Sequence, residues 1–593
     1  MQRRQRLPEI VAEGNSRKDS SSIAHLKGVQ SRANRQSGWG RTDRSTGLRC
    51  DVPLPSFDKE RAMSRARSKR TQTDEYARRI ARAFAKGQPP PLTAELERYC
   101  ESAPREVFAA FAGLARHLPR ADDDESLAVG YLVVLQRLLE TLRYRADRGY
   151  ADAAELIAEF QSEVVRQVRT GKVDAGVLAA LGDALHQSKI PASPELAALA
   201  VEQPVEHDDD GAPPDIRTAF DEILEACGRD PFETIVMLMK GSHAMPMDAR
   251  GAVAGAMALG GSAPARSAAV LFLLDPEASV RRAIADALEE VAGSLTPTDV
   301  RRLISMRNWR PETERAGVDA IVRKARAAGV DCAQWDEGGV TSVDASGIDG
   351  SATQIFLLVS PSGRKVRLSS LMTKGGVADA WSHQPEPRRA IDRQIAEARR
   401  DIPTLAVSRA YLDRVVAHQL ALGLQDGGVP PGGLLQVAET IGGADWQPSL
   451  MPFEKTLADL IAEVPKTMRQ PAAVTSILQR SDELVDLEAI AQSWFEDSPE
   501  VAQAIEQASG ASRPKLATYL LQTVFAQHRQ KWADMFLRTA LWMHEASPAG
   551  DLCWPDLAIV TQALVEGREM TEIGLMRDIA MRTIDVQRDT APF

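Results

Sequence analysis

The chain has 593 residues, of which 44% are hydrophobic and 26% are charged, the balance of a soluble globular protein with room for several domains or one long repeat array. No stretch approaches 18 uninterrupted apolar residues, so a membrane-spanning helix is not expected. The five cysteines are far apart and form no C-x-x-C pair, which argues against a zinc module or a disulfide framework and favours a cytoplasmic setting.

The N-terminus is basic although the whole chain carries a net charge of −10. Residues 1–70 hold 17 lysines and arginines against 7 aspartates and glutamates. A segment so rich in arginine, serine and glycine cannot bury enough apolar surface to fold alone, so we expect a disordered extension. Two alternatives stay open: a tail that binds nucleic acid, and a true translation start at Met63, which would make most of the basic excess an artefact.

Apolar residues then recur three and four positions apart, which predicts an N-terminal helical region over residues 74–202. The proline- and aspartate-rich residues 203–214 predict a linker. The expected helices are 74–86, 104–117, 125–144, 151–169 and 175–186.

Residues 215–337 are repetitive. Arg250, Arg281 and Arg315 fall 31 and 34 residues apart, and each is followed by an apolar residue three and seven positions later. Self-similarity at such a period is typical of stacked helical repeats. Residues 264–293 carry the fullest unit, in which Asp275-Pro276-Glu277 joins two amphipathic helices.

This unit resembles HEAT-like repeats, with the best match over residues 248–328. Asp275 occupies the turn, Val280 and Arg281 open the second helix, and Leu288 supplies a large core residue. The resemblance implies an α-solenoid in which Asp275 and Arg281 bridge neighbouring repeats. It implies a fold element that binds other macromolecules, and no particular activity.

Residues 338–373 predict a small antiparallel β insertion, with strands at 353–359 and 365–371, a turn at 361–363 and a possible third strand at 340–345. Both faces of the first strand are apolar, so we expect it to be covered on both sides, as a wedge between two helical halves. The sheet could brace the repeats, which we favour, or pair through an exposed edge with an incoming strand.

From Lys374 the sequence again predicts helix, and residues 374–593 are expected to form a C-terminal helical domain. Phe525, Trp532 and Phe536 are spaced seven and four apart, on one face of a predicted helix over residues 514–546. Such a stripe is usually core, and the alternative is a groove for a partner peptide. The other expected helices are 387–399, 408–422, 434–441, 452–463, 473–480, 484–495, 499–508, 554–566 and 571–584.

Complete catalytic signatures are missing: there is no GxxxxGK[ST], GxGxxG after a strand, GxSxG or HExxH. We therefore expect no catalytic, metal-binding or cofactor-binding residues. The sequence favours a predominantly α-helical, cytoplasmic protein-interaction scaffold built on a HEAT-like α-solenoid, with an unidentified protein partner. Two alternatives remain: a nucleic-acid-associated helical protein that uses the basic arm, against which the acidic body argues, and an enzyme whose site is assembled from distant helices.

Overall fold

The computed structural model divides into two compact units. The first is built on residues 72–202 and the second on residues 222–239 and 247–589. The predicted extension 1–70 and the linker 203–214 lie outside the described residues. The structure describes residues 72–86, 91–118, 121–202, 222–242, 247–335, 339–442, 445–484, 487–508, 510–548 and 551–590.

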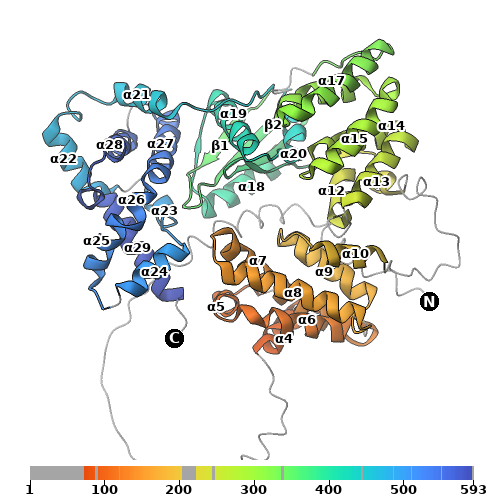
Figure 1. Ribbon diagram of the computed structural model, residues 1–593. Coiled ribbons are helices and arrows are strands. Elements are labelled where there is room, and N and C mark those ends of the chain that lie inside the picture. The colour runs from red at the N-terminus through yellow and green to blue at the C-terminus, as the bar shows by residue number, and fades with distance from the viewer. Residues whose placement is uncertain are drawn as a thin grey trace, which may run out of the picture. The chain divides into compact units, whose positions relative to one another are not determined.

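The first unit is helical throughout its described part (Figure 1). Its longest helix, α7, contacts α4, α6, α8 and α9 and so forms the centre of the unit. Side chains three and four apart on α7, among them Val134, Leu135 and Leu138, are fully buried, as the apolar spacing predicts. The helices are α4 (Gln72–Phe84), α5 (Ala94–Ser102), α6 (Val107–His117), α7 (Ala121–Asp147), α8 (Ala151–Arg169), α9 (Ala175–Gln187) and α10 (Pro194–Glu202).

The second unit begins with helix pairs, drawn in green in Figure 1. Helices α13, α15 and α17 pack side by side, and α14 packs against α16. Small residues allow the close approach: a Cβ at Gly251 would lie 3.4 Å from that of Ala283, and one at Gly317 would lie 3.8 Å from that of Ala285. The helices are α12 (Pro231–Ser242), α13 (Met247–Gly260), α14 (Ala263–Leu271), α15 (Ala278–Glu290), α16 (Pro297–Met306) and α17 (Glu312–Ala327).

A five-stranded antiparallel sheet follows, in the order β4-β3-β2-β1-β5. The antiparallel sheet was predicted, but three strands were expected. The expected helix from Lys374 is wrong over 377–382, because Gly375 and Gly376, at φ +59° and +152°, reverse the chain and return it to pair with β3. The strands are β1 (Ser342–Ser346), β2 (Gln354–Ser362), β3 (Lys365–Thr373), β4 (Val377–Ser382) and β5 (Thr404–Ala406).

Both faces of β2 are covered, as its two apolar faces predict. Phe356 and Leu358 join a hydrophobic core that includes residues of α19, whereas Ile355 and Leu357 join a smaller core with residues of α18, such as Ile391. The sheet is therefore sandwiched between helices. The covering helices are α18 (Arg388–Asp401) and α19 (Arg409–Gln425).

The remaining helices form the part of the chain that follows α19. The helix predicted over residues 514–546 is broken into α25, α26 and α27, because Thr523 and His528 depart from helical backbone angles. Short 3₁₀ helices lie at Pro104–Glu106, Phe272–Leu274, Ala292–Ser294, Arg307–Trp309, Ser481–Glu483 and Met570–Glu572. The α-helices are α20 (Gly433–Thr440), α21 (Phe453–Glu463), α22 (Pro471–Gln479), α23 (Glu488–Ala491), α24 (Pro499–Gln507), α25 (Arg513–Gln522), α26 (Val524–Gln527), α27 (Arg529–Ala546), α28 (Trp554–Val565) and α29 (Gly574–Thr590).

One hydrophobic core, which we call the central core, runs from Leu224 to Ile584 through the repeat helices, one face of the sheet and the C-terminal helices. Two buried tryptophans join the C-terminal part of the chain to the sheet, because each donates a hydrogen bond to a backbone carbonyl in or next to β1. The Trp494 Nε1 donates to the Ile348 carbonyl at 2.9 Å, and the Trp542 Nε1 donates to the Ala345 carbonyl at 3.1 Å. The two tryptophans thus tie the region of β1 to the C-terminal part of the chain, more than a hundred residues further along.

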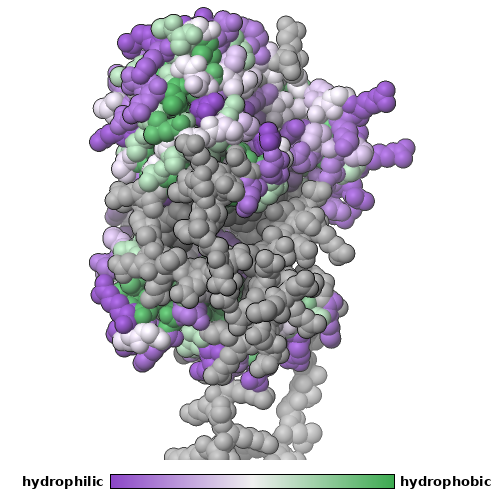
Figure 2. Space-filling view, turned by 90° about the vertical axis from the view of Figure 1, so that its right-hand side faces the viewer, coloured by the Kyte–Doolittle hydropathy of each residue, from purple (hydrophilic) through white to green (hydrophobic). Residues whose placement is uncertain are grey.

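The surface is mixed. In Figure 2, which faces the right-hand side of Figure 1, the coloured surface shows hydrophobic patches bordered by hydrophilic side chains. Large exposed apolar side chains include Val236, Met237 and Leu259. Among the described helices, none combines the length and the apolar composition needed to cross a bilayer.

Candidate functional site

The two edges of the sheet are in different environments. Next to β4 lies α20: a Cβ at Gly433 would sit 1.8 Å from the Ala380 carbonyl oxygen, and the Ser382 N–H donates to the Gln436 Oε1 at 3.2 Å. The other edge strand, β5, pairs with β1 and with no other described strand. Within the described residues, β5 is therefore the edge strand whose outer side neither another strand nor α20 covers.

The hydrogen-bond register shows which backbone groups of β5 point outward. The Gly347 N–H donates to the Pro403 carbonyl at 3.3 Å, and the Val407 N–H donates to the Val343 carbonyl at 2.9 Å. The backbone N–H and C=O groups of the odd-numbered residues in this segment therefore point toward β1. Thr404 and Ala406 direct their N–H and C=O groups away from it, because successive residues of an antiparallel strand alternate.

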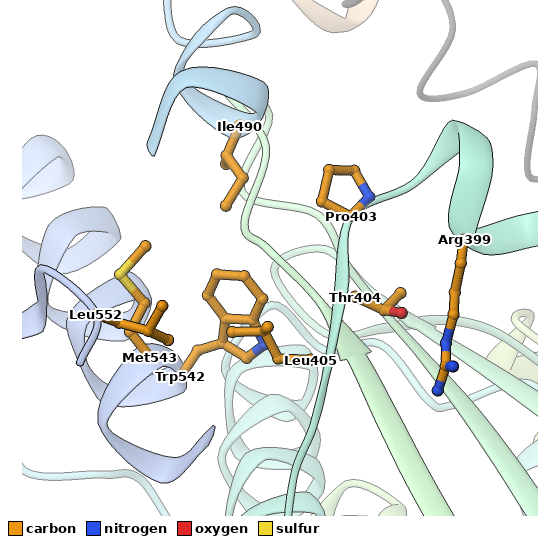
Figure 3. Close-up of a pocket in the computed structure, with 8 residues that line it drawn as sticks. All are labelled: Arg399, Pro403, Thr404, Leu405, Ile490, Trp542, Met543 and Leu552. Atoms are coloured by element: carbon orange, nitrogen blue, oxygen red, sulfur yellow. The ribbon is translucent and has the colours of Figure 1, made fainter. Parts of the chain in front are cut away.

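A half-open pocket of about 240 Å³ lies against this edge. Figure 3 shows Leu405 and Trp542 on one side of β5, with Met543 and Leu552 farther from the strand on the same side; all four line the pocket. Trp542 and Met543 come from α27, and Ile490 comes from α23. This side of the edge is apolar and is built by elements distant in sequence.

The other side of β5 is polar. In Figure 3, Thr404 and Arg399 lie across the strand from Trp542. One Nη of Arg399 donates to the Asp344 Oδ1 at 2.6 Å, while half of the arginine side chain stays exposed. The Thr404 hydroxyl is buried, and no described group hydrogen-bonds to it. A buried hydroxyl without a partner is costly, and a bound ligand could satisfy it.

The residues singled out in the repeat lie in a buried ion-pair network. Arg250 in α13 pairs with Asp275 in the turn before α15 at 3.4 Å, and Arg281 in α15 pairs with Glu314 in α17 at 2.7 Å. Arg281 also donates to the Asp275 carbonyl at 2.7 Å. Burial raises the pKa of Asp275, although Arg250 opposes the shift.

The other repeat residues have simpler roles. Val280 and Leu288 are buried in the central core. Arg315 instead donates to the Arg310 carbonyl at 3.2 Å, just before its own helix α17. Of the three arginines that are in register in the sequence, Arg250 and Arg281 each pair with a carboxylate. Arg315 donates to a backbone carbonyl.

The aromatic stripe lies inside the protein. Phe525, Trp532 and Phe536 are fully buried; the Phe525 and Trp532 rings stack with centroids 5.8 Å apart, and the Trp532 and Phe536 rings are tilted by 50° with centroids 5.9 Å apart. The alternative that they line an open partner groove is therefore wrong. They are core because α26 and α27 turn this face toward the C-terminal helices.

Sequence reasoning missed one polar cluster, centred on the buried carboxylate of Glu496. It accepts from the Lys531 Nζ at 2.8 Å and from the Trp532 Nε1 at 2.9 Å, and the His528 Nδ1 lies 3.4 Å away. Glu496 and Lys531 are 35 residues apart, so no local sequence pattern predicts this contact. The carboxylate is already saturated with donors, which is the arrangement of a structural tie. No group of three metal-ligating side chains occurs within the described ranges.

Comparisons with known proteins identify two segments. Residues 246–329 match a family model described as the Y4lR second domain, and residues 454–588 match one described as the Y4lR C-terminal helical domain. The first covers α13 to α17, and the second covers α21 to α29 almost completely.

One relative is an uncharacterized protein, y4lR, of Sinorhizobium fredii (strain NBRC 101917 / NGR234). It is 26% identical over 329 residues, which are 54% of this chain and 61% of the relative. The chain thus spans about three fifths of the length of this relative. No solved structure matches. The chain is therefore similar to Y4lR over the helices α13–α17 and over its C-terminal helices.

Proposed function

We propose that this protein is a non-catalytic protein-interaction scaffold, built on a HEAT-like α-solenoid that works in the cytoplasm. The side-by-side packing of α13, α15 and α17 supports the solenoid, as do the ion pairs of Arg250 and Arg281. None of the four described cysteines forms a disulfide bond, which suits a reducing compartment.

The observation that carries the proposal is the contrast between the two sheet edges. The β4 edge is covered by α20, whereas the β5 edge meets a pocket. Exposed edges invite unwanted pairing and are usually covered or blocked, so an open edge beside an apolar pocket is the arrangement of a docking site. The Trp542 Nε1 donates to the Ala345 carbonyl of β1, which anchors α27 beside that edge.

Affinity capture from native lysate, followed by reconstitution from purified components, tests the proposal. A protein that re-forms a stoichiometric complex with the full chain supports the scaffold. Nucleic acid that co-purifies and is removed by salt would instead favour the basic arm as the binding element. A chain that re-forms no complex with any captured protein contradicts the proposal.

A further inference from the structure

We infer that the outer edge of β5 binds an extended peptide in which acidic and apolar residues alternate. The peptide adds a strand to the sheet, places one apolar side chain in the pocket and sets an acidic neighbour against Arg399. This inference rests on the proposed scaffold function and names the chemistry of the partner segment.

Backbone geometry determines how the peptide pairs. Thr404 and Ala406 each offer an outward N–H and an outward C=O, so an added strand can make a short ladder with β5. Residues directly opposite in such a pair point to the same face of the sheet. The peptide residue beside Leu405 therefore points to the Trp542 side, and its two neighbours point to the Arg399 side (Figure 3).

The size of the pocket selects a side chain rather than a small molecule. Ligand pockets usually measure about 300–1,000 Å³. The space here, about 240 Å³, suits one leucine- or phenylalanine-sized group. The lining by Leu405, Ile490, Trp542, Met543 and Leu552 makes that group apolar.

The charge beside the edge selects acidic neighbours. Helix α18 leads into β5, and its described exposed charged side chains are Arg388, Arg389, Arg393, Arg399 and Arg400 against Asp392 and Glu397. The exposed Asp392 already pairs with Arg388 at 2.8 Å. The exposed surface of this helix is therefore predominantly basic on a chain whose net charge is −10. The guanidinium of Arg399 has further donors beyond the one given to Asp344, so it can bind a second carboxylate.

The test uses the full-length chain and labelled heptapeptides, read by fluorescence anisotropy. An alternating glutamate–leucine peptide should bind. A permuted peptide of the same composition, with the glutamates and leucines in separate blocks, should bind at least about tenfold more weakly, because it cannot sort its side chains to two faces. Equal binding of the two peptides overturns the inference.

Two variants at one position test strand addition. Ala406→Pro removes an outward N–H and leaves the bonds to β1 in place, so peptide affinity should fall about tenfold. Ala406→Val keeps that N–H and should therefore lose clearly less affinity than Ala406→Pro. Equal losses in both variants contradict strand addition.

A protein-independent control covers the case in which Ala406→Pro does not fold. In a bound peptide strand, the N–H groups of alternate residues face β5 and those between them face away. N-methylation of the residues whose N–H groups face β5 should abolish binding, whereas N-methylation of the other residues should not. Arg399→Gln should weaken the glutamate–leucine peptide about fivefold and leave a glutamine–leucine peptide unchanged. Equal weakening of both peptides would overturn the role of Arg399.

The outcomes separate this inference from the scaffold proposal. A reconstituted partner that binds Ala406→Pro as well as the unchanged chain overturns the edge site and leaves the scaffold standing. A dimer of the chain alone that Ala406→Pro abolishes in sedimentation also overturns the inference, because a second copy would then occupy the edge.

Discussion

Buried charges in this protein are held by partners from neighbouring helices. The repeat register in the sequence points to Asp275 and Arg281 but not to Glu314, because the partner belongs to the next helix and depends on how the two helices pack. The Glu496–Lys531 contact leaves no sequence signal at all, since it joins the segment between α23 and α24 to α27, 35 residues further along the chain. Spacing predicts which residues share a helix face, whereas a partner on another element follows only from packing.

Arg281→Ala should destabilise the protein by about 3–5 kcal/mol, because it removes a buried guanidinium that pairs with the partly buried Glu314 carboxylate and donates to two backbone carbonyls. The neighbouring Arg282 is exposed, and Arg282→Ala should stay within about 0.5 kcal/mol of the unchanged chain. Urea unfolding of both variants measures the difference. Similar losses would show that Arg281 has no special role.

His418 should make stability depend on pH. Burial, with Arg538 nearby, lowers the pKa of His418 to about 4, and its Nδ1 accepts from the Met451 N–H at 3.2 Å. An unfolded histidine takes up a proton below about pH 6.5, whereas the folded one stays neutral until about pH 4. Stability is therefore lost as the pH falls through this window, by up to about 3 kcal/mol.

His418→Asn keeps an acceptor near the Met451 N–H and removes the titration. The stability difference between the unchanged chain and this variant should shrink steadily from pH 6.5 to pH 4 in urea melts. A difference that is constant over this window would contradict the assignment.

At the scale of elements, the sequence predicts the central strands of the sheet but not the edge strands β4 and β5. β2 contains the apolar run 355–359, and Gly363, which joins it to β3, has the positive φ of +60° that a tight hairpin needs. β4, with the sequence VADAWS, lacks such a run and becomes a strand by pairing with β3. β5 has three residues after Pro403, too few to show any alternation.

Adjacent glycines test the cover over the β4 edge. Gly433→Ala should destabilise the protein by about 1–3 kcal/mol, because the new methyl group meets the Ala380 carbonyl. Gly432→Ala meets no atom within 4 Å and should change stability by less than about 1 kcal/mol. Thermal melts of both variants measure this. If Gly433→Ala is as stable as Gly432→Ala, α20 does not clamp the edge.

At the scale of the whole molecule, the helical class could be predicted because apolar spacing recurs throughout the chain. The pocket could not, because Arg399, Leu405, Ile490, Trp542 and Leu552 meet only when α18, α23 and α27 pack around the sheet. Continuity of the central core through the sheet was expected from the two apolar faces of β2, and the structure confirms that both faces are covered.

Two neighbouring side chains on β2 should therefore behave differently. Phe356→Ala opens a hole in the central core and should destabilise by about 3–5 kcal/mol, with faster amide exchange in both α15 and α27. Ile355→Ala opens the smaller core under α18, so the faster exchange should concentrate in α18 and the sheet. Identical exchange patterns in the two variants would contradict a sheet wedged between helical halves.

Amide hydrogen exchange of the full chain, alone and saturated with a reconstituted protein partner, tests the scaffold proposal most directly. Docking at the sheet edge predicts slower exchange over residues 403–407, because the outward N–H groups of Thr404 and Ala406 gain acceptors, and slower exchange around Leu552 beside the pocket. Unchanged exchange over 403–407 in a saturated complex would contradict docking at this edge, and failure to form any stoichiometric complex would contradict the scaffold itself.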